Sequence, residues 1–233
     1  MPTMTTKETG GLAPLMTPTS FSAPECVMPP EQLDQFLTDT GLNGRFIADL
    51  LSSFLAHEQC GYHLYRTAIS LTNNPMLKGK YEEFCSETEE HIRIFDELSA
   101  ACGGQPGYVS PTARLVEATD TKIHEAAILL PDGADEATLD LVMLEAVVLA
   151  ETKCHADWTL VQQLTQEMPA GAARRAFQQA VDQVEEQEDE HIRWARDTWE
   201  KLIMTQAKSS VAQKGMAMAE KAVAPGSRTS FPD

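Results

Sequence analysis

The segment that decides the fold is EQEDEHIRWA at residues 186–195, because a close copy of it, SETEEHIRIF, occupies residues 86–95. Both copies contain Glu-His-Ile-Arg, at 90–93 and at 190–193. Upstream of each copy lies a second matching pair, FLAHEQCGYHLY at 54–65 and VLAETKCHADW at 148–158, which aligns Glu58 with Glu151. A repeat of this kind predicts two related structural halves.

Each matching segment belongs to a longer stretch in which apolar residues recur every three or four positions. The stretches span residues 44–72, 75–102, 135–168 and 170–205. In the first, for example, Ile47, Leu51 and Phe54 lie on one stripe. This spacing is typical of amphipathic helices, so four long helices are predicted.

The connections between these stretches predict how the helices are arranged. The first and third connections are short, whereas residues 103–134 form a long one that contains three prolines and a helical piece at about 113–130. Two hairpins joined by a long crossover need short, long and short connections in that order. We therefore expect an all-α fold, an antiparallel four-helix bundle of two helical hairpins.

The ends of the chain differ in composition from this central part. Residues 1–30 are rich in Pro and Thr and are expected to form a flexible arm. The run PEQLDQFL from Pro30 predicts a short helix. The predicted division is an arm at 1–30, a bundle at 31–205, and a helix extension with a flexible tail at 206–233.

Composition and charge exclude several classes of function. The 233 residues are 42% hydrophobic and 23% charged, as in an ordinary globular protein, and the net charge is −17. This charge disfavours binding to nucleic acid or to anionic lipid, and no stretch is apolar enough to span a membrane. The five cysteines form no Cys-x-x-Cys pair, and the chain shows no secretion signal, so a cytoplasmic protein with reduced thiols is expected.

The four helical stripes are interrupted by ionisable residues at positions that should face the interior. Those residues are Glu58, His91, Glu151, Glu188 and His191. A buried carboxylate needs a compensating partner, and two divalent cations would compensate several at once. Glu188 and His191 lie three residues apart on one helical face, so their oxygen and nitrogen atoms can converge on one ion.

On these residues the sequence resembles the ferritin-like superfamily, within it the rubrerythrin and bacterioferritin type of carboxylate-bridged di-metal proteins. The resemblance covers about residues 44–205. It implies that Glu58 and Glu151 are terminal ligands, that His91 and His191 are nitrogen ligands, and that Glu188 bridges the two metals.

One position departs from the pattern of that family. The first Glu-x-x-His would place glutamate at position 88, where this sequence has Thr88. Glu87 lies four residues before His91 and about 100° around the helix from Thr88, so it is a candidate replacement ligand. The alternatives are an asymmetric site with one weak or vacant position, and a site with one metal or none.

Two neighbouring residues are candidates for a catalytic role. Tyr62 and His155 each lie one turn after a predicted ligand, Tyr62 after Glu58 and His155 after Glu151. Tyr62, like Tyr65, could donate a hydrogen bond to a ligand carboxylate or supply an electron, and His155 could bind metal or donate a proton. Core packing for the tyrosines and a hydrogen-bonded interior role for the histidine are the alternatives. His57 and His63 are off the stripe and are expected at the surface.

These observations lead to an expected function. Oxygen ligands with imidazole suit two Fe ions, or Mn, and predict an oxidoreductase that activates O2 or H2O2 and oxidises iron, peroxide or a small organic substrate. An external electron donor and a homodimer or larger homo-oligomer are expected partners. The alternatives are a ferroxidase subunit of an iron-storage shell and a metal-free bundle that serves as an interaction module.

Overall fold

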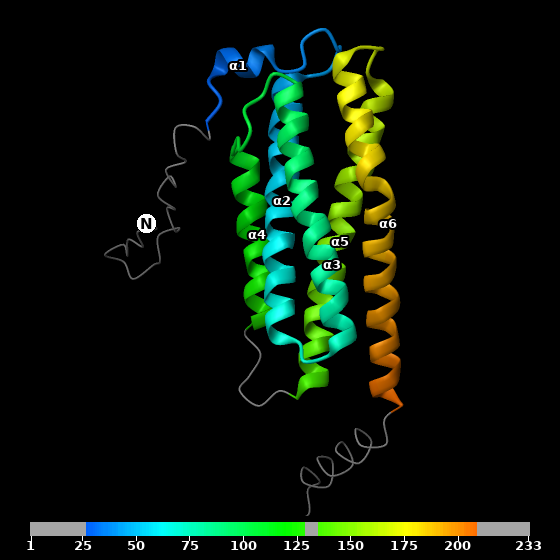
Figure 1. Cartoon of the computed structure of the whole chain (residues 1–233). Coiled ribbons are helices and arrows are strands. Elements are labelled where there is room, and N and C mark those ends of the chain that lie inside the picture. The colour runs from blue at the N-terminus through cyan, green and yellow to red at the C-terminus, as the bar shows by residue number, and fades with distance from the viewer. Residues whose placement is uncertain (1–26, 129–134, 209–233) are drawn as a thin grey trace, which may run out of the picture.

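The computed structural model describes residues 27–128 and 135–208, and within these ranges it contains helices and no strand (Figure 1). The all-α prediction is confirmed. The helices are α1 (Pro30–Gln35), α2 (Gly44–Leu71), α3 (Pro75–Ala101), α4 (Pro111–Ile128), α5 (Glu136–Glu167) and α6 (Ala172–Ala207). The predicted arm and tail lie outside the described residues up to residue 26 and from residue 209.

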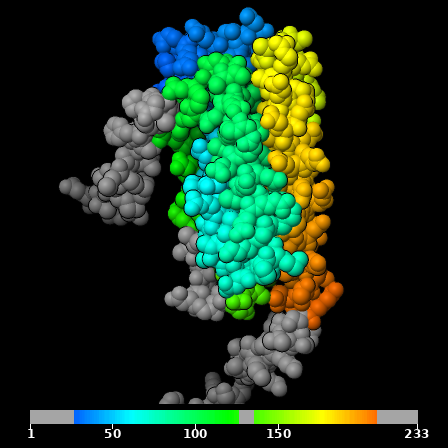
Figure 2. Space-filling model, in the orientation of Figure 1, coloured from blue at the N-terminus to red at the C-terminus, as the bar shows by residue number. Residues whose placement is uncertain are grey.

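The long helices lie side by side and enclose a common interior. Helix α2 packs against α3 and α5, and α6 packs against the same two helices. Residues 72–74 join α2 to α3 and residues 168–171 join α5 to α6, so the helices of each pair run in opposite directions (Figure 1). Helix α4 follows the outside of α2 and α5, and α1 lies across the end where α2 begins (Figure 2).

Side chains at the helix starts explain where these elements begin. Asn43, Asn74 and Asp135 are the N-cap residues of α2, α3 and α5, and each side chain accepts a hydrogen bond from a backbone N–H of the first turn. Helix α3 ends before Gly103, whose φ of +87° is the left-handed conformation that glycine adopts most readily. The long helices begin and end within two residues of the bounds that the sequence predicts.

The interior consists of two apolar layers with polar residues between them. One layer combines the first half of α2 with the second half of α3, and includes Phe54, Phe95 and Phe177. The other combines the second half of α2 with the first half of α3, and includes Tyr65 and Phe84. Along each of the four long helices, the predicted metal ligands fall between the residues of the two layers.

Polar contacts attach α4 to the outer side of α2. The hydroxyl of Ser52 donates to the carbonyl of Tyr108 at 2.6 Å and accepts from the backbone N–H of Ser110 at 2.9 Å. Asp49 accepts a hydrogen bond from the Thr112 hydroxyl at 2.5 Å. The long connection therefore packs against α2, and α4 is its helical part. No described helix is long and apolar enough to cross a bilayer.

Candidate metal centre

The five predicted ligands meet in the middle of the interior, and each of the four long helices contributes at least one of them. Glu58 comes from α2, His91 from α3, Glu151 from α5, and Glu188 and His191 from α6. All five are buried, and none is more than 2% exposed. The helical stripes therefore bring together the residues that they predicted.

Each of these residues carries one buried polar atom that makes no hydrogen bond within the described part of the chain. The atoms are Glu58 Oε2, His91 Nδ1, Glu151 Oε2, Glu188 Oε2 and His191 Nδ1. The remaining unpartnered atom of this kind is the hydroxyl oxygen of Tyr81, which belongs to an apolar layer. Buried polar atoms are nearly always paired, so five orphaned atoms at one place indicate a missing partner.

The potential ligand atoms form two groups that share Glu188. Glu58, His91 and Glu188 make one group, and Glu151, Glu188 and His191 make the other, with ligand atoms within 4.8 Å of one another in each. His91 Nδ1 lies 3.0 Å from Glu188 Oε1 and 3.9 Å from Glu58 Oε2. His191 Nδ1 lies 3.4 Å from Glu151 Oε2. Two carboxylates and one imidazole per group match the ligands that Fe(II) and Mn(II) accept.

Glu58 and Glu151, the two carboxylates that each belong to one group only, have a second oxygen that accepts a hydrogen bond from a buried aromatic residue. The indole N–H of Trp158 donates to Glu58 Oε1 at 2.8 Å, and the hydroxyl of Tyr65 donates to Glu151 Oε1 at 2.6 Å. Each donor comes from the helix of the opposite carboxylate, Trp158 from α5 and Tyr65 from α2. These bonds fix both carboxylates so that the free oxygens face inward.

The outer nitrogen of each histidine also has a partner. His91 Nε2 lies 2.9 Å from Gln187 Oε1, and His191 Nε2 lies 2.7 Å from Glu87 Oε2. The amide of Gln187 in turn donates to Glu87 Oε1 at 3.4 Å. Both imidazoles are thus held at Nε2 and present Nδ1 to the interior.

The geometry corrects the prediction that Glu87 replaces the missing ligand at position 88. Glu87 is outside both groups, and its side chain is 27% exposed while it bonds the outer nitrogen of His191. The reason is the rotation of about 100° between successive helical residues, which turns Glu87 away from the interior. Thr88 occupies the interior position itself and is buried, with its methyl group near Gly61.

Burial without a counter-ion shifts the protonation of the carboxylates. Burial, and then the neighbouring Glu188, raise the pKa of Glu58 from 4.5 to about 7, and burial also raises the pKa of Glu188 well above its ordinary value. Burial pushes the pKa of Glu151 upward too, but the nearby His191 and Tyr65 outweigh it and leave that pKa lowered. Burial lowers the pKa of His191, but Glu151, Glu188 and Glu87 outweigh this effect and raise that pKa to about 9.

Neither of the two candidate catalytic residues joins this centre. The ring of Tyr62 packs beside His63 at 5.5 Å and under the guanidinium of Arg66, while Tyr65 makes the bond to a ligand carboxylate. His155 is not in the interior: its side chain is 43% exposed and pairs with Asp189 at 3.0 Å. The heptad step from Glu58 to Tyr65 keeps that residue on the inner face, and this spacing could have favoured it over Tyr62.

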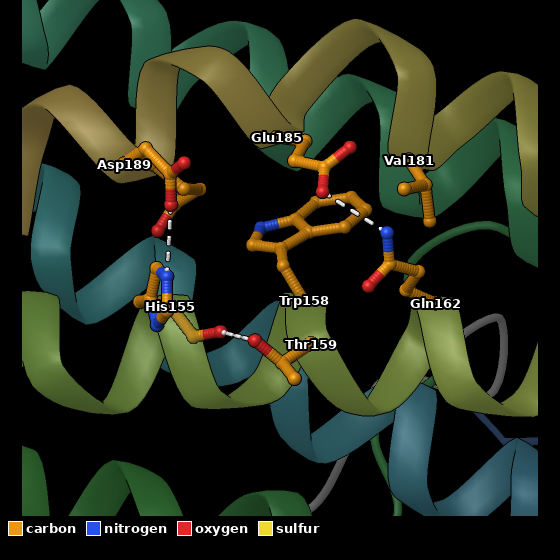
Figure 3. A pocket seen from close by; sticks show the side chains of 8 residues that line it. His155, Trp158, Thr159, Gln162, Val181, Glu185 and Asp189 are labelled. Carbon is orange, nitrogen blue, oxygen red and sulfur yellow. Dashed lines mark hydrogen bonds and ion pairs between the residues drawn. The ribbon is translucent and has the colours of Figure 1, made fainter.

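A narrow cleft between α5 and α6 reaches one of the ligands. It has a volume of about 40 Å³, and its lining includes Trp158, Glu185 and Glu188. Two polar bridges cross it on either side of Trp158, from His155 to Asp189 and from Gln162 to Glu185 (Figure 3). Glu188, although only 2% exposed, therefore forms part of the wall of this cleft.

A second buried polar group was missed by the sequence argument. His57 was expected at the surface, but it is 2% exposed, and its two ring nitrogens lie 2.6 Å from Asp120 Oδ2 and 3.0 Å from the carbonyl oxygen of Ala150. Asp120 belongs to α4, which covers this side of α2. The prediction was wrong because helical periodicity in the four long helices carries no information about the packing of α4 against α2.

Comparison with known proteins supplies one likeness, and it concerns the fold. No protein-family model matches the chain, and no curated protein matches its sequence. A solved structure of YcfI from Rhodopseudomonas palustris, described as a "putative structural protein", is similar with a TM-score of 0.54 and 16% identity. The match covers 69% of this chain and 97% of that chain. At this identity the likeness indicates a shared helical fold and nothing about activity.

Proposed function

We propose that the chain is a ferritin-like four-helix bundle that binds two divalent metal ions and acts as an oxidoreductase on O2 or peroxide. The observation that carries the proposal is the set of five orphaned atoms, one on each of five buried acidic or imidazole side chains. Two cations would give every one of these atoms a partner, and would offset the cost of burying three carboxylates together.

The residues divide naturally between two metal positions. Glu58 and His91 would hold one ion, Glu151 and His191 the other, and Glu188 would bridge them because it belongs to both groups. With Thr88 in place of a second bridging carboxylate, at least one of the two ions would keep a coordination position open for water or a reactant. Iron is the first choice and manganese the second, since carboxylate oxygen and imidazole nitrogen suit both.

When bound, a pair of ferrous ions supplies the electrons that reduce O2 or H2O2, and the chain determines what reaches them. The two apolar layers exclude bulk water above and below the centre. Trp158 and Tyr65 hold the outer carboxylates in place. The cleft beside Trp158 is narrow, which favours iron, O2 and peroxide over a bulky organic substrate.

The experiment that tests the proposal is an anaerobic titration of the metal-free protein with Fe(II), followed by exposure to O2. We expect binding to saturate at about two equivalents per chain, and the bound Fe(II) to be oxidised faster than Fe(II) in buffer. Remaining Fe(II) is measured with a ferrous chelator, and binding by the change in near-ultraviolet absorption.

Two variants make this test specific. Glu188→Gln removes the shared carboxylate and should abolish binding of the second equivalent and the rapid oxidation. Glu186→Gln makes the same chemical change at an exposed position two residues away on α6, and should behave as wild type. Wild-type protein that binds no Fe(II), or a Glu188→Gln protein that still oxidises it, would show that the proposal is wrong.

A further inference from the structure

The two histidines of the centre are connected by a chain of polar side chains that runs outside the ligand shell. It passes from His191 to Glu87 at 2.7 Å, from Glu87 to Gln187 at 3.4 Å, and from Gln187 to His91 at 2.9 Å. Glu87 comes from α3 and Gln187 from α6, so each holds the histidine of the opposite helix. Residues 87 and 187 occupy equivalent positions, four residues before His91 and His191.

We propose that Glu87 is the positioning residue for both histidines, directly for His191 and through Gln187 for His91, and that it makes the two metal positions unequal. This inference rests on the proposed function, because it concerns the nitrogens that would bind metal. It assigns Glu87 a role other than that of a ligand.

Counting donors and acceptors shows why one carboxylate and one amide are needed. To offer Nδ1 to a metal, each neutral imidazole must carry its proton on Nε2, so each needs an acceptor there. The contact between residues 87 and 187 needs one donor and one further acceptor. Glutamate at 87 and glutamine at 187 together supply the three acceptor oxygens that these contacts use, and the glutamine amide is the one donor that they require.

Other pairs at these two positions fail the same count. Each of the three contacts here uses a separate oxygen, and two glutamines provide only two, so either the contact between residues 87 and 187 or one imidazole loses its acceptor. An imidazole that faces an amide donor must keep Nε2 unprotonated and carry its proton on Nδ1, where it blocks the metal. Two glutamates would place like charges side by side without a donor between them.

Glu87 and Gln187 also make the two metal positions different from each other. His191 donates to a carboxylate, whereas His91 donates to a neutral amide. A carboxylate acceptor makes an imidazole a stronger metal ligand and adds negative charge near the ion, and such outer partners change metal affinity by about 10- to 100-fold. The position formed by Glu151 and His191 is therefore expected to fill first, and the position formed by Glu58 and His91 second.

The test is a titration of the metal-free protein with Co²⁺, a divalent ion that air does not oxidise during the titration. Calorimetry and visible absorption measure its binding. Wild-type protein should bind Co²⁺ in two steps that differ by at least about 10-fold in affinity. Glu151→Gln should remove the tighter step, and Glu58→Gln the weaker one.

Variants at residues 87 and 187 then distinguish a positioning role from a purely structural one. Glu87→Gln should weaken one position by at least about 10-fold, whereas Glu186→Gln, the same change on an exposed face, should leave both steps unchanged. The exchange variant, Glu87→Gln combined with Gln187→Glu, restores one carboxylate and one amide. It should recover both steps with their order reversed, so that Glu58→Gln now removes the tighter one.

Nuclear magnetic resonance of the metal-free protein gives a readout that does not depend on metal. Two-bond ¹H–¹⁵N spectra recorded above the pKa of His191, where the ring is neutral, should show the proton of each histidine on Nε2 in wild type, and a changed protonation pattern of one ring in Glu87→Gln. The inference is overturned if Glu87→Gln keeps both affinities, or if the exchange variant binds no better than Glu87→Gln. Wild type that binds no Co²⁺ but shows these Nε2 protons would refute the metal function and leave the positioning role intact.

Discussion

Two groups of buried polar residues in the described part of the interior differ in how completely they are paired. In the group between α2, α4 and α5, both ring nitrogens of His57 face oxygen acceptors, Asp120 and the carbonyl of Ala150. In the central group, His91 and His191 each keep one nitrogen without a hydrogen bond, and three carboxylates each keep one free oxygen.

The difference separates a structural role from a binding role. A buried histidine with both nitrogens bonded has no atom left for a ligand, so His57 can only connect helices. A buried histidine held at Nε2 has carboxylates beside its Nδ1 but no hydrogen bond there, so that nitrogen is left available to a ligand. Pairing, and not burial alone, therefore distinguishes the two groups.

The largest expected effect tests the structural group. His57→Ala removes the partner of the buried Asp120 carboxylate and should lower the free energy of unfolding by about 3–5 kcal/mol, because a buried charge is left uncompensated. Urea denaturation of the metal-free protein measures this. His63→Ala, at an exposed position on the same helix, should change stability by less than about 0.5 kcal/mol. Equal effects of the two variants would contradict the structural role of His57.

The second prediction concerns the pH dependence of the metal-free protein. The pKa of Glu58 is raised from 4.5 to about 7, so the folded state binds this proton more tightly than the unfolded state does. The free energy of unfolding should then fall by about 3 kcal/mol as the pH rises from about 4.5 through 7. His191, with its pKa raised to about 9, loses its contribution as the pH rises further from about 6.5 through 9.

Urea denaturation at a series of pH values between 5 and 9 measures this trend. Glu58→Gln should flatten its lower part, because an amide does not titrate. Metal-loaded wild type should lose much less stability over the same range, since its carboxylates are already deprotonated. A metal-free protein that becomes more stable between pH 5 and 9 would show that the central carboxylates are compensated in some other way.

A smaller effect of opposite sign is expected for the shared carboxylate. Glu188→Gln should raise the stability of the metal-free protein by about 1–3 kcal/mol near pH 8, because it replaces a buried carboxyl group that is costly to ionise and has an unpartnered oxygen. The same variant should lose the stabilisation that metal gives to wild type. Thermal unfolding with and without Co²⁺ measures both quantities. A destabilised metal-free variant would place Glu188 among the structural residues beside His57.

The smallest expected effect is on metal affinity, and it distinguishes two tyrosines of α2. Tyr65→Phe removes the hydrogen bond to Glu151 and should weaken the metal position at Glu151 by about 10-fold. Tyr62→Phe should leave metal binding unchanged, because the Tyr62 ring packs beside His63 and Arg66. Co²⁺ titration of both variants checks this, and equal losses would mean that Tyr62 also supports the site.

Periodicity was sufficient to predict the long helices and the side chains that meet between them. The stretch predicted at 75–102 forms α3 at Pro75–Ala101, and the one predicted at 170–205 forms α6 at Ala172–Ala207. An acidic or imidazole residue on an otherwise apolar stripe is conspicuous, because its position on the helix and its chemistry disagree. For this reason the sequence alone is sufficient to name all five interior ligand candidates.

Contacts that depend on a second helix could not be predicted in the same way. His57 is one position from Glu58, and it is buried where α4 and α5 both pack against α2. Glu87 was recognised as important, but its role depends on where α6 places His191 and Gln187. Periodicity indicates which face of a helix is inside, and it carries no information about which neighbour covers the remaining faces.

The bond between Trp158 and Glu58 also gives the centre a natural optical reporter. The indole donates directly to a candidate ligand, stacks on Phe95 with ring centroids 4.2 Å apart, and lies 6.0 Å from the ring of His91. Its fluorescence should therefore respond when a paramagnetic ion occupies the neighbouring position. Occupancy could then be followed in real time in the unlabelled protein, with Trp158→Phe identifying the contribution of this one indole.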